Sequence, residues 1–177
     1  MSAARTQTPS PKKSEPALTF EWERLDRALG EGLEDMLAAH WEEVALDKDT
    51  VALAIDWDRY RRLERDEVLK SVAMRQGHNR RLVGYNVFFV SPPMHYRTWS
   101  WAVNDVLYLD PAFRNGLAGA RLIIEAEKLI RTLEPKIQKI VYHSKLHVFG
   151  ARGRTVGDLL TKLGYPLIEE VHGKVLF

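Results

Sequence analysis

The stretch Val106–Leu133 reads VLYLDPAFRNGLAGARLIIEAEKLIRTL and combines three local signals. Residues 106–109 are branched and aromatic, which predicts a β-strand that ends at Asp110-Pro111. After a loop with two glycines, apolar residues recur every three or four positions through residue 133, which predicts an amphipathic helix. Together these elements predict an anion site, because the first helical turn has unpartnered backbone N–H groups and the helix dipole favours negative charge there.

Length and composition limit the class of protein. The 177 residues suffice for one domain with a real core, and 45% hydrophobic and 28% charged residues are ordinary for a soluble globular chain. A net charge of +2 disfavours nucleic acid or an anionic membrane as a partner. The absence of cysteine excludes disulfides, thiolate zinc sites and cysteine nucleophiles. With no bilayer-length apolar run, we expect a cytoplasmic protein that is not in a membrane.

The chain divides into a short tail and one predicted domain. Residues 1–17 are rich in Ser, Thr, Pro and Lys and lack large apolar anchors, so they predict a disordered N-terminal tail. Residues 18–177 are expected to form a single domain. The sequence leaves open whether this domain forms a homodimer.

The first half of the domain predicts helices followed by strands. A helical pattern from Phe20 to Val44 is interrupted by Gly30 and Gly32, which favours two short helices or a bent one. Residues 56–64 predict another helix, capped by the aspartate at 56 or 58. Residues 66–76 and 81–90 flank a Gly-His-Asn turn and predict a β-hairpin. Residues 96–109 predict one long strand.

In that long strand, regular pairing would place alternate residues on one face, whereas a bulge would swap the faces beyond it. The residues expected to share a face are Trp99, Trp101, Val103, Asp105, Leu107 and Leu109.

The second half alternates helix and strand. We expect a helix over residues 118–133, a strand over 136–144, a helix over 155–163 stopped by Gly164, and a last strand over 171–177. This order predicts a mixed α/β fold, with a central, mostly antiparallel mixed sheet flanked by helices.

The loop from Arg114 to Ala120 carries the strongest chemical signal. Its sequence is neither a mononucleotide P-loop nor a dinucleotide fingerprint. A diphosphate-bearing ligand fits the loop, with Arg114 adding a charged fork. The alternative is a purely structural turn, since glycines also end strands and start helices.

The same region resembles the GNAT superfamily of N-acetyltransferases. The family motif is Arg or Gln, two residues, Gly, one residue, then Gly or Ala; Arg114 and Gly119 occupy its first and last positions. Leu117 stands where the middle glycine is usual, and Gly116 lies one residue early. The segment KLGYPLIEE at residues 162–170 also resembles the family's closing segment. The similarity covers about residues 35–177 and is nearest to phage-encoded members with an unassigned acceptor.

This resemblance implies acetyl-coenzyme A (acetyl-CoA) as the acetyl donor and an amine acceptor, either a small molecule or a protein. It also implies a strand at residues 107–109 that splays away from the strand at 140–142 and lines the pantetheine arm of the donor. The residues implied to contact the donor are Leu107, Tyr108 and Leu109 along the arm, and the backbone N–H groups of Arg114, Asn115, Gly116, Leu117, Ala118, Gly119 and Ala120 at its pyrophosphate.

For catalysis the resemblance implies an acid on the fourth strand as the general base, and Asp105 is the candidate. The alternative is a solvent-exposed or arginine-paired Asp105. The usual tyrosine acid of the family is replaced by Leu160. Tyr142, His143, Ser144 or water could take its place. No metal is expected, because the two nearby histidines at 143 and 147 have no evident third ligand.

The acceptor pocket is expected in the helical segment before residue 67. Its wall would include Trp41, Trp57 and Tyr60, and the acids available to attract a cationic amine are Glu42, Glu43 and Asp58. Because the helix tyrosine is absent and the loop glycine is displaced, an inactive acetyl-CoA-binding or protein-interaction module is the alternative function.

Overall fold

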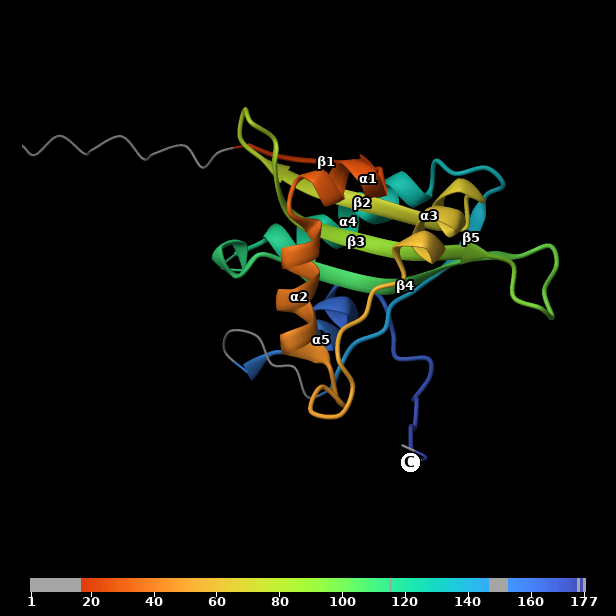
Figure 1. The fold of residues 1–177 in the computed structure, drawn as a ribbon. Coiled ribbons are helices and arrows are strands. Elements are labelled where there is room, and N and C mark those ends of the chain that lie inside the picture. Colours follow the sequence, from red (N-terminus) through yellow and green to blue (C-terminus); the bar gives the residue numbers. More distant parts are fainter. Residues whose placement is uncertain (1–16, 115, 147–152, 175, 177) are drawn as a thin grey trace, which may run out of the picture.

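The computed structural model describes residues 17–114, 116–146, 153–174 and 176. Its centre is a five-stranded sheet in the order β1-β2-β3-β4-β5 (Figure 1). The first four strands are antiparallel neighbours and β5 runs parallel to β4, so the predicted mixed, mostly antiparallel sheet is confirmed. The strands are β1 (Leu18–Glu23), β2 (Leu69–Gln76), β3 (Arg81–Ser91), β4 (Ser100–Leu109) and β5 (Ile137–Val141).

Helices cover both faces of this sheet. Three helices lie over one face: α1 (Leu25–Gly30), α2 (Leu33–Val44) and α3 (Trp57–Arg65) (Figure 1). On the opposite face lies α4 (Ala118–Ile130), and α5 (Val156–Lys162) follows β5 in the chain. A short 3-10 turn, η1 (Pro111–Phe113), links β4 to the loop before α4. None of the described helices is long and apolar enough to cross a membrane.

Two apolar cores separate these layers. The α1–α3 core includes Leu25, Leu33, Tyr85 and Tyr108, whereas the α4 core includes Val72, Phe88, Ala102, Leu122 and Ile130. Since burying apolar side chains is the main favourable term in folding, the two cores fix which side of each strand faces which helices.

A bulge in β4 overturns the single-face pattern expected for that strand. Val87 pairs with Val106 but Phe88 pairs with Asn104, so Asp105 has no partner on β3. The extra residue swaps the faces beyond it. As a result Leu107 and Leu109 pack with the α4 core, while Val106 packs with the α1–α3 core.

Two other predicted boundaries were also wrong. Phe20–Glu23, expected to be helical, forms part of β1, because pairing with β2 outweighs the helical spacing. The strand expected from residue 96 begins at Ser100, after turns in which the N–H groups of Tyr96 and Trp99 donate to carbonyls three residues earlier.

The described residues of 171–177 form no strand. Val171 and Leu176 are 80% and 89% exposed. The last strand expected in this segment is therefore not formed by its described residues. Residues 1–16, expected to be a tail, lie outside the described part of the chain.

Several local signals were read correctly. Gly32 has a φ of +93° and separates α1 from α2, as its interruption of the helical pattern predicted. Asp56 caps α3, where its side chain accepts a 2.8 Å hydrogen bond from the N–H of Arg59. Gly164, with a φ of +90°, follows α5 in the backbone conformation that glycine adopts most readily.

Candidate functional site

The neighbouring strands β4 and β5 part in the middle of β4. Their ladder runs from Ser100–Ile137 to Val103–Val141 and stops there. The two strands therefore part directly after Val103, so residues 107–109 lie beyond the end of the ladder. The predicted partner residues were wrong, because Ile140 and Val141 pair with Ala102 and Val103 instead of facing residues 107–109 across the gap. Among the described residues, the backbone groups on this side of β4 beyond Val103 have no strand partner, which suits an extended, amide-rich ligand.

The start of α4 retains the features of an anion site. Leu117 is the N-cap residue, but its side chain makes no capping hydrogen bond and is 76% exposed. The first helical bond runs from the N–H of Arg121 to the carbonyl of Leu117, so the N–H groups of residues 118–120 precede it. No acidic residue stands in this first turn, and Gly116 takes a φ of +121°, which favours glycine. Asn115 lies outside the described residues.

The side chain of Arg114 is already engaged within the protein. Its Nε donates to the carbonyl of Leu109 at 2.7 Å, and its Nη2 pairs with Glu43 of α2 at 2.9 Å. Its guanidinium also lies over the Tyr108 ring, 5.3 Å from the centroid. The Arg114 guanidinium, expected to reach a diphosphate, instead joins the loop to α2. The candidate anion-binding groups that remain in this loop are its backbone N–H groups.

Asp105 projects from the bulge on the α1–α3 side of the sheet. The hydroxyl of Tyr60 donates to its Oδ2 at 3.3 Å. Asp105 is an exposed residue, as the alternative to the base role expected, and it has a tyrosine rather than an arginine as its partner. Partial desolvation nevertheless raises the pKa of its carboxyl above the usual range, although the Tyr60 hydrogen bond and nearby His143 oppose this rise. Burial and Asp105 together raise the pKa of Tyr60 to about 12. A carboxylate with a raised pKa beside this parting of the strands has the chemistry of a proton acceptor.

Tyr142 directly follows β5 and its side chain lies with the α4 core, on the opposite face from Asp105. Its ring packs edge-on against Phe88 and Tyr165, with centroids 5.6 and 5.3 Å away. Its hydroxyl oxygen accepts a 2.9 Å hydrogen bond from Nδ2 of Asn86. Burial raises the pKa of Tyr142, so the phenol keeps its proton.

Two asparagines on neighbouring strands connect the bulge to this tyrosine. Nδ2 of Asn104 donates to Oδ1 of Asn86 at 2.8 Å, and both residues are at most 2% exposed. No role was predicted for Asn86 from the sequence. The signal was its position inside the apolar run RLVGYNVFFV, where a buried amide requires partners.

Ser144, another predicted catalytic residue, lies elsewhere. Its Oγ is 3.1 Å from the point where a Cβ on Gly157 would stand, which places it against the start of α5. Within the described residues, Ser144 has no hydrogen bond to Asp105 or to the asparagine pair. Leu160, at the position of the family's tyrosine, is 5% exposed.

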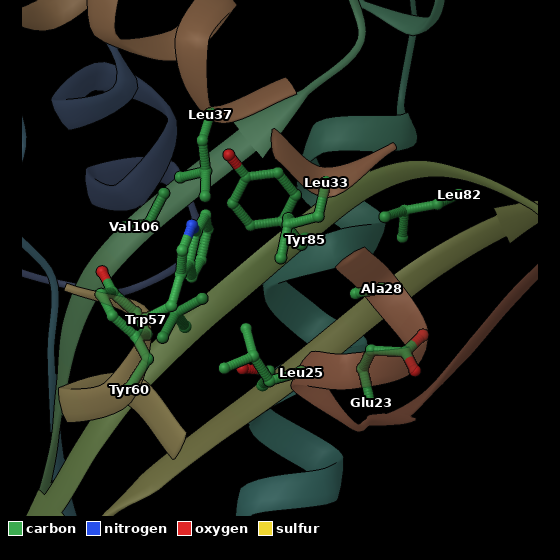
Figure 2. A pocket seen from close by; sticks show the side chains of 12 residues that line it. Glu23, Leu25, Ala28, Leu33, Leu37, Trp57, Tyr60, Leu82, Tyr85 and Val106 are labelled. Carbon is green, nitrogen blue, oxygen red and sulfur yellow. The ribbon is translucent and has the colours of Figure 1, made fainter. Parts of the chain in front are cut away.

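The expected acceptor wall is divided between two hollows. Trp57 and Tyr60 line a narrow cavity between α1–α3 and the sheet, with their rings 5.8 Å apart (Figure 2). The space inside is about 30 Å³, room for about one water molecule. The buried hydroxyl of Tyr85, another lining residue, has no hydrogen-bond partner among the described residues.

Trp41 lies in a different place, in a surface hollow between α2 and the segment after it. Glu42 shares this hollow and pairs there with Lys48 at 3.2 Å. Of the other two expected acids, Glu43 holds Arg114 and Asp58 pairs with Arg61 at 3.4 Å. The acid next to the strand parting is therefore Asp105. In the described part of the chain, no three His, Asp or Glu side chains are grouped to hold a metal ion.

No protein-family model and no curated protein sequence matches this chain. Solved structures match it in fold. Glucosamine-6-phosphate N-acetyltransferase of Arabidopsis thaliana is 9% identical, with 91% of this chain and 99% of that chain covered and a TM-score of 0.64. Ribosomal-protein-alanine N-acetyltransferase of Brucella melitensis biovar Abortus is 17% identical, with coverage of 91% and 99% and a TM-score of 0.63.

An aminoglycoside acetyltransferase from an uncultured soil sample, solved with sisomicin, is 14% identical, with 90% of this chain and 95% of that chain covered and a TM-score of 0.60. At sequence identities this low, the structural similarity establishes the fold and nothing finer. The chain thus has the acetyltransferase fold that its resemblance to the GNAT superfamily predicted.

Proposed function

We propose that this protein transfers an acetyl group from acetyl-CoA to a primary amine by direct attack in a ternary complex. The observation that carries the proposal is the parting of β4 and β5, with Asp105 on one face of the sheet and Tyr142 on the other. A base on one side and a phenol on the other suit a reaction in which an amine enters from one face and a thiolate leaves toward the other. The chain has no cysteine to carry the acetyl group, which favours direct transfer.

The parts of the donor match parts of this cleft. The N–H groups of Ala118, Gly119 and Ala120, which precede the first helical hydrogen bond of α4, would hold the pyrophosphate, and the backbone of residues 107–109 would line the pantetheine arm. Acetyl-CoA would supply the acetyl group as an activated thioester. Arg114 would hold the loop in place through Glu43 and the carbonyl of Leu109.

Asp105 would act as the base that takes a proton from the attacking amine. As the new C–N bond forms and the C–S bond breaks, the proton passes to the carboxylate and the electron pair stays on sulfur. The proton then returns from Asp105 to the thiolate through solvent, so that the reaction yields an amide and a thiol. The raised pKa of Asp105 makes it a stronger base than a carboxylate at its ordinary pKa.

The acceptor would be a primary amine of a small molecule or a protein. The structural neighbours named above include enzymes for both kinds of amine, glucosamine-6-phosphate and a ribosomal protein. The second candidate function is a module that binds acetyl-CoA without catalysis, which the buried Leu160 favours because the family's helix tyrosine is missing there. Release of thiol from acetyl-CoA in the presence of an amine panel separates the two.

Donor binding is tested first, by thermal unfolding with and without acetyl-CoA. A ligand at about 100 times its Kd stabilises the folded state by about 2.7 kcal/mol, or about 5–10 °C for a chain of this size. Leu117→Asp introduces a side chain that can cap α4, so the protein without ligand should have a higher melting temperature. The same side chain adds a negative charge at the proposed anion site, so the melting-temperature shift caused by acetyl-CoA should become smaller.

Leu117→Asn is the matched control, because it introduces a similar cap without the charge. It should raise the melting temperature of the protein alone and keep most of the ligand-induced shift. No shift in the wild type would refute donor binding, and equal shifts in both variants would refute the placement of the anion at α4.

A further inference from the structure

We propose that Asn104 and Asn86 act as positioning residues that turn the O–H of Tyr142 outward, so that Tyr142 donates a hydrogen bond to the sulfur of the acetyl donor. This inference rests on the proposed acetyl transfer. It assigns roles to two buried asparagines, each at most 2% exposed, that lie on β4 and β3.

The orientation of Asn104 is set by the backbone. Its Nδ2 lies 3.0 Å from the carbonyl oxygen of Val106 and 3.2 Å from that of Val87, as well as 2.8 Å from Oδ1 of Asn86. Carbonyl oxygens only accept hydrogen bonds, so the atom of Asn104 that faces them must be the amide nitrogen. The backbone on both sides of the bulge therefore fixes which way this amide points.

The orientation of Asn86 follows from that of Asn104. The atom of Asn86 that meets the Asn104 nitrogen must be its oxygen, which leaves its nitrogen facing the hydroxyl of Tyr142 at 2.9 Å. That nitrogen donates, so the hydroxyl oxygen accepts. The Tyr142 hydroxyl therefore does not donate a hydrogen bond to Asn86. No other acceptor for its hydrogen is found among the described residues.

The backbone of Tyr142 stands at the point where β4 and β5 part, and its side chain reaches from there to Asn86 of β3. Tyr142 directly follows the last residue of β5, and the ladder to β4 ends at the preceding residue, Val141. Contacts with Phe88 and Tyr165 restrict the ring, and Asn86 occupies one side of the oxygen. The hydroxyl is thus preorganised to donate a hydrogen bond to the sulfur of a donor bound between the parted strands. A fixed hydrogen-bond donor stabilises a reaction most at the atom that gains negative charge, which in this reaction is the sulfur.

The test measures the acidity of the thiol of coenzyme A bound to the protein, with no amine present. The ultraviolet absorbance of the thiolate is followed as pH rises, for free coenzyme A and for its complexes with each variant. A hydrogen bond from Tyr142 to sulfur stabilises the thiolate, so the pKa of the bound thiol should lie about one unit or more below that of the free thiol.

Three variants define the outcome. Tyr142→Phe should return the bound thiol to the free value. Asn86→Leu, in which Tyr142 is intact but no longer held, should lose at least half of the effect. Asn79→Ala, at an exposed turn asparagine, should behave as wild type. If Asn86→Leu does not fold, Asn86→Ala is expected to give the same loss.

The outcomes separate the two levels of the proposal. Wild-type thiol acidity in a folded Asn86 variant that still binds coenzyme A would overturn the positioning role. Wild-type acidity in Tyr142→Phe would remove Tyr142 from the sulfur altogether. Failure of the wild-type protein to bind coenzyme A, seen as no change in melting temperature, would instead refute the proposed function on which this inference rests.

Discussion

Replacing Arg75 with methionine tests how the sheet edge and α1 are held together beside the candidate acceptor region. Arg75 of β2 is 0% exposed, and its Nε donates to Glu23 at 3.1 Å. It also pairs with Glu31, the residue that follows α1, lies 3.3 Å from a carboxylate oxygen of Glu21, and donates to the carbonyl of Arg80 at 2.7 Å. Glu23 itself is 7% exposed and lines the cavity under α1.

The expected cost follows from what Arg75→Met leaves behind. Glu23 keeps the N–H of Arg24 at 3.0 Å and a distant guanidinium of Arg27 at 3.9 Å, but it loses its buried counter-ion. Breaking a buried pair by removing one partner costs about 3–5 kcal/mol. For a chain of this size that lowers the melting temperature by about 6–20 °C.

The assay is urea unfolding of Arg75→Met, Glu23→Met and the double variant, analysed as a double-mutant cycle. Because an apolar pair can replace a buried ion pair at little cost, the double variant should recover at least half of the loss seen in Arg75→Met. The view that Arg75 compensates a buried Glu23 charge would be refuted by either of two results. One is a loss of unfolding free energy below about 1 kcal/mol in Arg75→Met, and the other is a double variant whose loss equals the sum of the two single losses.

Three further results are expected. Tyr60→Phe removes a hydrogen bond that lowers the pKa of Asp105, so the pKa of that carboxyl should rise. NMR titration should show the midpoint at higher pH, and an unchanged midpoint would contradict the Tyr60–Asp105 hydrogen bond. Arginine contacts lower the pKa values of Glu21 and Glu31, so these carboxylates stabilise the folded protein at a pH above the usual carboxyl range, and this stabilisation is lost as pH falls through the lowered values. Chemical unfolding across acidic pH should show this loss, and the loss should be smaller in Arg75→Met. Gly84→Ala would place a Cβ 3.0 Å from a neighbouring backbone carbonyl and should destabilise the protein by about 1–3 kcal/mol in urea unfolding, whereas Gly30→Ala, whose Cβ meets nothing within 4 Å, should not.

Parts of the candidate site could be predicted because their signals are local. The strand, loop and helix at residues 106–133 are marked by adjacent residue types, and α4 does begin at Ala118, next to Gly116 with its positive φ. The helix boundary at Gly32 and the cap at Asp56 depend on backbone conformation and on one nearby N–H group, so the sequence alone determined them.

Tertiary structure decided the rest, because each remaining feature depends on partners far away in the chain. The side on which Asp105 lies depends on a bulge against β3, which alternation within β4 cannot reveal. The strand at Phe20–Glu23 depends on an edge offered by β2 about fifty residues later, and it overrides a helical spacing. The meeting of Asn86 with Tyr142, 56 residues apart, exists only because β3, β4 and the end of β5 lie side by side and exclude water. In that setting a buried amide must find a protein partner, and no local pattern could identify which one.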